Sequence, residues 1–216
     1  EPGPAIPLTS QNQALVAEVD LRPVEEVLVD SPTGRQVQVL LVKPHGFDPA
    51  RKYPVIVNVH GGPQMQWADA YRPDAQVYPG AGYVVAFPNP HGSTGQGQDY
   101  TAAISGDWDG KVMKDVRAVA DWLSVQKWAD ADRMGAMGWS WGGYAMMWLA
   151  GHDHPFKALA SMMGVYDLRS MYSMTEELWF PEWDLKGTPW QNPEGYARQS
   201  PSSYVTKFKT PTLVLT

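Results

Sequence analysis

Residues 137–143 have the sequence Met137-Gly138-Trp139-Ser140-Trp141-Gly142-Gly143, which contains the pattern Gly-x-Ser-x-Gly. The pattern follows the short apolar run Met134–Met137 and precedes Gly143–Ala150, a segment that is apolar almost all round. A serine between a buried strand and a buried helix lies on a sharp, strained turn, where glycines leave room for the neighbouring elements. The helix N-terminus also favours negative charge beside the serine. The sequence therefore predicts that Ser140 is a nucleophile; the alternative is a glycine-rich turn with an incidental serine.

The chain around this motif alternates short apolar runs with amphipathic segments. Val24–Asp30 and Gln36–Lys43 flank Ser31-Pro32-Thr33-Gly34, a pattern typical of a β-hairpin. Apolar residues within Gly110–Gln126 recur at helical spacing. Further strands are predicted at Val55–Val59, Tyr83–Phe87, Met134–Met137, Ala158–Met163 and Thr212–Leu215. A hairpin followed by alternating strands and helices predicts an α/β fold with a mostly parallel central sheet flanked by helices.

Composition excludes several classes of function. The 216 residues suit one domain, and 44% hydrophobic with 19% charged residues is typical of a globular protein. The net charge is −6 and the longest cationic run is Arg51–Lys52, which argues against a nucleic-acid partner. The absence of cysteine excludes thiol catalysis and is compatible with cytoplasm or periplasm. No motif requires a metal or another cofactor, no apolar run is long enough to span a membrane, and no signal peptide is recognisable.

Two segments differ from the rest of the chain. Residues 1–23 are rich in proline and polar residues and predict a linker, with at most one short strand. Residues 24–216 then form the catalytic domain. Met171–Ser203 is rich in Trp and Pro, and as an insertion between two strands it should lie over one end of the sheet. This insertion either contributes to a ligand pocket or packs as a helical excursion on the surface.

A second motif supports the assignment of the nucleophile. His60-Gly61-Gly62-Pro63 follows Val55–Val59 and resembles the His-Gly-Gly loop that donates a backbone N–H to the oxyanion hole of many α/β-hydrolases. The developing oxyanion would lie between the N–H of Trp141 and an N–H from Gly61 or Gly62. Each such donor is typically worth about 3–4 kcal/mol of transition-state stabilisation.

A serine hydroxyl also needs a base, and in this fold the chain order is serine, acid, histidine. His152 and His154 follow Ser140, but at about 1.5 Å rise per residue they lie roughly 18 Å away along the helix. His60 and His91 precede the nucleophile and are candidates for lining the pocket, not for the base.

The acid is also absent from its expected place. Asp167 is a candidate, although an N-cap role is favoured for it. Catalytic acids characteristically follow a strand such as Thr212–Leu215, and the chain stops there. We therefore expect a partial domain, incomplete at its C-terminal end, whose catalytic Asp and His lie beyond Thr216.

Six motifs occur in a fixed order along nearly the whole chain: Lys52-Tyr53-Pro54, His60-Gly61-Gly62-Pro63, Asn89-Pro90-His91-Gly92-Ser93-Thr94-Gly95, Gly106-Asp107-Trp108, Gly138-Trp139-Ser140-Trp141-Gly142-Gly143-Tyr144 and Thr175-Glu176-Glu177-Leu178-Trp179-Phe180-Pro181-Glu182. In this order they resemble the catalytic domain of the prolyl oligopeptidase family of serine peptidases. Within it, the branch of acylaminoacyl peptidases and related bacterial dipeptidyl-peptidases is the most similar. His91 stands where many relatives have arginine.

The resemblance implies an α/β-hydrolase fold with Ser140 as nucleophile and the N–H groups of Gly62 and Trp141 as oxyanion hole. It makes Thr175–Trp183 part of an apolar wall, and the candidate pocket residues are His60, Tyr144, Trp179 and Phe180. It further implies an upstream β-propeller, with Leu8–Asn12 as its tail, and leaves a homo-oligomer open.

The implied activity is hydrolysis of short peptides, releasing a dipeptide or a blocked residue through an acyl-enzyme on Ser140. The isolated chain should be essentially inactive. A carboxylesterase, or an inactive fragment acting as a binding module, are the alternatives.

Overall fold

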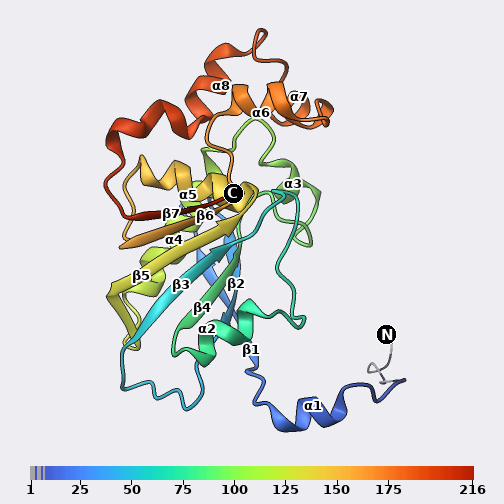
Figure 1. Ribbon diagram of the computed structural model, residues 1–216, viewed down its shortest axis with the longest axis vertical. Coiled ribbons are helices and arrows are strands. Elements are labelled where there is room, and N and C mark those ends of the chain that lie inside the picture. The colour runs from blue at the N-terminus through green and yellow to red at the C-terminus, as the bar shows by residue number, and fades with distance from the viewer. Residues whose placement is uncertain (1–2, 4–5, 7) are drawn as a thin grey trace.

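The computed structural model describes residues 3, 6 and 8–216. Within these residues a seven-stranded sheet has the order β1-β2-β4-β3-β5-β6-β7. The strands are β1 (Val24–Asp30), β2 (Gln36–Val42), β3 (Tyr53–Val59), β4 (Val84–Asn89), β5 (Ala129–Trp139), β6 (Ala158–Met162) and β7 (Thr212–Leu215). β1 and β2 form the predicted antiparallel hairpin, and β4, β3, β5, β6 and β7 run parallel to one another. The predicted mostly parallel α/β architecture is confirmed (Figure 1).

Helices cover the two faces of the sheet unequally. The helices are α1 (Gln13–Glu18), α2 (Asp74–Gly80), α3 (Gln98–Ala102), α4 (Lys111–Ser124), α5 (Trp141–Ala150), α6 (Leu168–Met174), α7 (Trp179–Asp184) and α8 (Pro193–Gln199), with a 3-10 helix at Pro201–Lys207. The predicted helix within 110–126 and the buried helix after Ser140 correspond to α4 and α5. α4 and α5 pack on one face, whereas α2 packs against β2 and β4 on the other.

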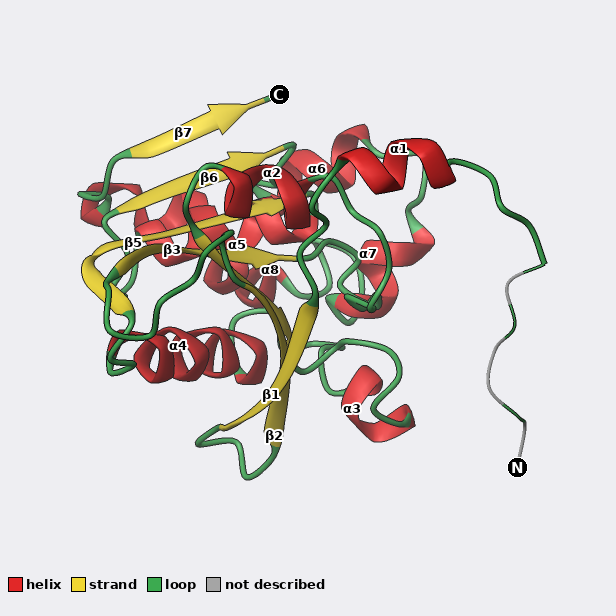
Figure 2. Ribbon diagram, turned by 90° about the horizontal axis from the view of Figure 1, so that it is seen from below, coloured by secondary structure: helices red, strands yellow, loops and turns green. Residues whose placement is uncertain are grey.

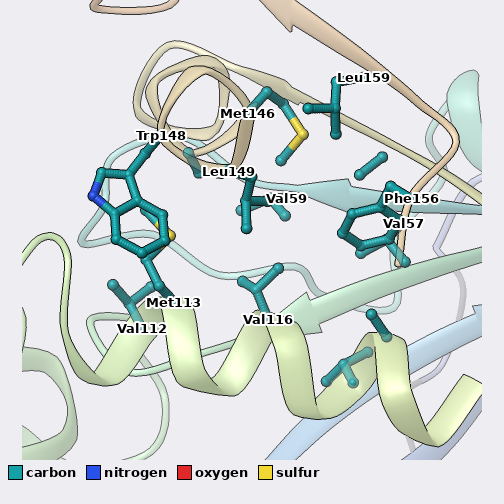
Figure 3. Packing of buried hydrophobic residues seen from close by; sticks show 14 of the residues in the cluster. Val57, Val59, Val112, Met113, Val116, Met146, Trp148, Leu149, Phe156 and Leu159 are labelled. Atoms are coloured by element: carbon teal, nitrogen blue, oxygen red, sulfur yellow. The ribbon is translucent and has the colours of Figure 1, made fainter. Parts of the chain in front are cut away.

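The main core lies between β3 and the pair α4 and α5. β3 is largely buried on both faces, as expected for an inner strand of a parallel sheet. On one face its β-branched side chains Val57 and Val59 pack against these helices. Figure 3 shows these valines with Val112, Met113 and Val116 of α4 and Met146 and Leu149 of α5. This packing fixes the end of β3 against the start of α5.

β7 forms one edge of the sheet and β1 the other (Figure 2). On the described chain β7 pairs with β6 alone, and its side chains Leu213, Val214 and Leu215 are exposed. The face of β5 and β6 opposite α5 also presents an exposed Trp139. The sheet therefore has an open apolar edge on the side of β7.

The segment before the hairpin differs from the expectation of a possible strand. Residues 13–18 form helix α1, and the described part of residues 1–23 contains no strand. Leu15 and Val16 of α1 are exposed. The predicted propeller tail at residues 8–12 is described but carries no regular structure before the turn that starts α1.

The insertion between β6 and β7 folds into α6, α7, α8 and the 3-10 helix, at one end of the molecule in Figure 1. Asp167 caps α6, since its Oδ1 accepts a hydrogen bond from the Ser170 N–H at 2.9 Å. The N-cap role favoured from the sequence is confirmed.

Candidate active site

Ser140 occupies a strained turn between β5 and α5. Its backbone has φ 58° and ψ −116°, a conformation that residues other than glycine seldom adopt. Two backbone hydrogen bonds hold it: the Ser140 N–H donates to the Met162 carbonyl at 2.9 Å, and the Ser140 carbonyl accepts from the Tyr144 N–H at 2.9 Å. The side chain is exposed at the end of the strand. This geometry presents a hydroxyl to an incoming ligand at a helix N-terminus.

The glycines around Ser140 are required by close backbone contacts. A Cβ on Gly138 would lie 2.4 Å from Gly142, and one on Gly142 would lie 2.1 Å from the Val59 carbonyl oxygen. A Cβ on Gly143 would lie 2.6 Å from the Met162 carbonyl oxygen. The start of α5 is thus pressed against the ends of β3 and β6, which is why the motif tolerates no side chain there.

The loop after β3 lies directly against the nucleophile. A Cβ on Gly61 would be 3.2 Å from Ser140 Cβ and 2.9 Å from the Trp139 carbonyl oxygen. Gly62 has φ +114°, a conformation that favours glycine. Within the described chain neither the Gly62 nor the Trp141 N–H donates to a protein acceptor. Both N–H groups belong to segments adjoining Ser140, and their position is compatible with the predicted oxyanion hole.

His60 holds this loop in place. Its imidazole is buried, with Nδ1 at 2.7 Å from the Gly61 carbonyl oxygen and Nε2 at 2.8 Å from Ser93 Oγ. Burial lowers the pKa of His60. The neutral ring donates from Nδ1–H to Gly61 and accepts the Ser93 hydroxyl at Nε2. Because both nitrogens are engaged, His60 is not available as the base for Ser140.

The other histidines are engaged elsewhere. His91 Nδ1 lies 2.6 Å from Asp115 Oδ2 in a buried pair. His152 Nδ1 donates to the Trp148 carbonyl at 2.7 Å, His154 Nε2 lies 3.2 Å from Thr210 Oγ1, and His45 contacts Asp20. Over residues 3, 6 and 8–216, no histidine forms a hydrogen bond with Ser140.

Asp167 is likewise committed to a structural role. Besides capping α6, it accepts a hydrogen bond from Ser202 Oγ at 2.7 Å. Burial raises the pKa of its carboxyl, but the hydrogen bonds from Ser202 and Ser170 outweigh burial and the net pKa is lowered. The carboxylate therefore stays ionised and stabilises the start of the insertion.

A cleft of about 440 Å³ adjoins Ser140. Its lining includes His60 and Ser140 together with Gly61, Gly62, Trp67, Arg72, Trp139 and Met162. The Arg72 guanidinium lies 3.9 Å from the centre of the Trp67 ring, and its Nε lies 3.2 Å from Asp74 Oδ1. Neither Arg72 nor Asp74, the first residue of α2, was predicted from the sequence, because neither lies in a recognised motif.

The predicted pocket aromatics do not gather in this cleft. Tyr144 differs from the expectation, since its side chain is fully buried in the core and its hydroxyl donates to the Gln199 carbonyl at 2.8 Å. Phe180 packs against Trp108, with ring centres 5.8 Å apart. Trp179 is 68% exposed on α7. Trp179 and Phe180 therefore lie outside this cleft. Phe180 contacts Trp108, which in turn packs against Trp141.

Neither a metal site nor a membrane span is found in the part of the chain that the structure describes. No group of three or more His, Cys, Asp or Glu side chains is placed to hold a metal ion there. The described helices also lack the length and apolar character needed to cross a bilayer.

Comparison with known proteins agrees with this geometry. Dipeptidyl-peptidase 5 of Schizosaccharomyces pombe is 38% identical over 94% of this chain, and that of Porphyromonas gingivalis is 34% identical over 99%. The structure of Pyrococcus horikoshii acylaminoacyl peptidase superposes on 96% of the chain with a TM-score of 0.88 and 26% identity. The match covers 31% and 32% of the two dipeptidyl-peptidases and 34% of the acylaminoacyl peptidase, so the chain spans about a third of the length of these relatives.

The structural similarity identifies the fold as that of the α/β-hydrolase peptidases. The model of the prolyl oligopeptidase family of peptidases matches residues 69–216, which include Ser140 and the whole insertion. On this match the chain belongs to the prolyl oligopeptidase family.

Proposed function

We propose that the protein containing this chain is a serine peptidase that cleaves short peptides through an acyl-enzyme on Ser140. One observation carries the proposal: an exposed serine lies at a helix N-terminus, with the Gly61-Gly62 loop packed against its side chain. This arrangement is the one that acyl transfer to serine requires. The names of the relatives support release of a dipeptide or of a blocked residue.

In the proposed reaction Ser140 Oγ attacks the carbonyl carbon of the scissile bond while a base takes its proton. The resulting oxyanion accepts hydrogen bonds from the N–H groups of Gly62 and Trp141, which are fixed before the reaction begins. The amine leaves with a proton returned by the base. Water then attacks the ester on Ser140 by the same route.

We propose that the base and its orienting acid come from residues outside these 216. Each histidine of the chain already has a partner other than Ser140, and Asp167 caps α6. The open edge at β7 lies beside β6, whose end holds the backbone of Ser140. Further chain added at this edge would therefore arrive next to the nucleophile.

We also propose that residues 1–23 link the catalytic domain to an upstream β-propeller. The relatives are about three times as long as the chain, and α1 projects away from the sheet with exposed Leu15 and Val16 (Figure 1). A propeller over the site would restrict access to short peptides.

A fluorophosphonate probe followed by intact-protein mass tests the nucleophile. We expect one adduct per molecule of the full-length protein and none in the matched Ser140→Ala variant. The same probe should leave the isolated 216-residue chain unlabelled, and burst kinetics from that chain would contradict an external base.

Substrate assays on the full-length protein test the reaction class. Dipeptidyl and N-acetyl amino-acid arylamides should be hydrolysed faster than a simple acyl ester matched in leaving group. Turnover of the ester alone would instead identify a carboxylesterase.

A further inference from the structure

Asp184, the last residue of α7, is a fully buried carboxylate with donors from two other segments. Both of its oxygens lie 3.2 Å from Gln64 Nε2, and Oδ2 lies 3.1 Å from Trp108 Nε1. Its backbone carbonyl accepts the Gly106 N–H at 2.6 Å. One residue therefore joins α7, the loop after β3 and the loop before α4.

The two donors lead to the two proposed halves of the oxyanion hole. Gln64 lies two residues after Gly62 in the same loop. Trp108 packs edge-on against Trp141, with ring centres 6.2 Å apart. The N–H groups of Gly62 and Trp141 come from segments that are far apart in the sequence, and the Asp184 carboxylate connects both.

The strength of this connection follows from its burial. Burial raises the pKa of Asp184, whereas hydrogen bonds from Gln64 and Trp108 and the charge of Lys186 lower it, and the net pKa is raised. Hydrogen bonds to a carboxylate are stronger than those between neutral groups, and removing one partner leaves a buried polar atom unsatisfied. The Gln64 loop is exposed at Gly62, Gln64, Met65 and Gln66. Besides Asp184, it is held by His60 at the Gly61 carbonyl and by the Thr94 N–H, which donates to the Met65 carbonyl at 3.0 Å.

We propose that Asp184 is a positioning residue that fixes the N–H groups of Gly62 and Trp141 relative to each other, and so couples α7 to the oxyanion hole. The proposal rests on the function proposed above. Oxyanion donors act through their fixed placement, so a loop displaced by a fraction of an ångström should slow the chemical step more than it weakens substrate binding.

A double-mutant cycle in the full-length protein tests this coupling. We expect Gln64→Ala and Asp184→Asn each to lower kcat about tenfold, a part of the 10²–10³-fold loss known for removing an oxyanion donor, with KM changed by less than about twofold. The double variant should be no slower than Asp184→Asn alone, because both changes break one connection. Gln64 is exposed, so Gln64→Ala remains informative even if Asp184→Asn folds poorly.

Asp115 provides the matched control. It is also fully buried and accepts hydrogen bonds from Ser31, Thr33 and His91, but it does not contact the Gln64 loop. Asp115→Asn should lower Tm, and its effect on kcat should add to that of Gln64→Ala. Unchanged kcat in Gln64→Ala, or equal non-additivity with Asp115→Asn, would overturn the coupling.

Hydrogen exchange provides a measurement that needs no activity. Backbone amides of residues 61–66 should exchange several-fold faster in Asp184→Asn than in the wild type, whereas those of residues 130–135 should not change. Unchanged exchange at 61–66 overturns the coupling. An inactive wild type overturns the proposed function, and exchange then decides the coupling alone.

Discussion

His60 Nε2 lies 2.8 Å from Ser93 Oγ, so one buried imidazole joins the loop after β3 to the loop after β4. The same ring is bonded through Nδ1 to the Gly61 carbonyl at 2.7 Å, directly beneath the proposed oxyanion hole. The histidine of the His-Gly-Gly motif thus acts by holding backbone, not by moving a proton.

The burial of His60 predicts a dependence of stability on pH. Burial lowers its pKa below the ordinary 6.5, so the folded protein resists protonation where the unfolded chain accepts it. Stability should therefore be lost as pH falls from about 6.5 toward the lowered pKa of the native state, by up to about 1.4 kcal/mol per pH unit. Urea unfolding of the full-length protein at pH 7.5 and 5.5 measures this loss.

His60→Gln is the control, because an amide keeps hydrogen-bonding capacity without titrating. The variant should lose less stability than the wild type between the two pH values. An equal loss in both proteins would show that folding does not lower the pKa of His60.

Gly142 should not tolerate alanine. The added Cβ would lie 2.1 Å from the Val59 carbonyl oxygen, and neither β3 nor α5 can move without breaking the core. We expect Gly142→Ala to destabilise the protein by at least about 3 kcal/mol or to abolish folding. Thermal unfolding is compared with that of Gly135→Ala on β5, the strand that precedes α5, because a Cβ on Gly135 would meet its nearest atom at 3.4 Å.

Asp167→Ala separates a cap from a catalytic acid. Loss of the N-cap hydrogen bond from the Ser170 N–H should lower the free energy of unfolding by about 1 kcal/mol, which is typical when an N-cap residue is replaced by alanine. The folded variant should keep kcat within about threefold of the wild type. A fall of about 10⁴-fold, as expected when the acid of a triad is removed, would identify Asp167 as catalytic instead.

Trp179 tests the apolar wall predicted for Thr175–Trp183. Its side chain is 68% exposed, so Trp179→Ala should change Tm little. If the wall binds substrate, KM for peptides with a large apolar residue before the scissile bond should rise about tenfold. Val125→Ala, at a similarly exposed position after α4 (76%), should leave KM unchanged. Unchanged KM in Trp179→Ala would remove this residue from the binding surface.

Most of the fold was predictable because its strands are short apolar runs: β3 and β4 are buried in the sheet, and β1 belongs to a hairpin with its own turn pattern. β1 and β7 have the predicted bounds, and α4 lies inside the predicted range. β5 begins five residues earlier than predicted. The first part of this strand was missed because it contains the charged residues Asp130, Asp132 and Arg133 and lies outside the apolar interior. α2 and α3 were missed because helices of seven and five residues show little periodicity, and α2 contains Pro79.

The site divides in the same way between local and long-range features. Ser140 and the loop at Gly61 were found because each is a short motif with its own backbone geometry. The link between Gln64 and Asp184 spans 120 residues, and no local pattern predicts such a pair. The sequence signal for this pair was Asp184 itself, which stands between Trp183 and Leu185. A carboxylate that is buried among such apolar residues needs a hydrogen-bond partner.

The open edge of β7 also governs how the 216-residue chain behaves on its own. Leu213, Val214 and Leu215 are exposed on a strand whose outer backbone groups are unpaired within the described residues, and such edges recruit further strands. Copies of the isolated chain should therefore self-associate as their concentration rises, with particle size by light scattering increasing accordingly. Replacing the central residue in Val214→Lys should keep them apart, so the variant would be the more suitable material for solution work on this domain.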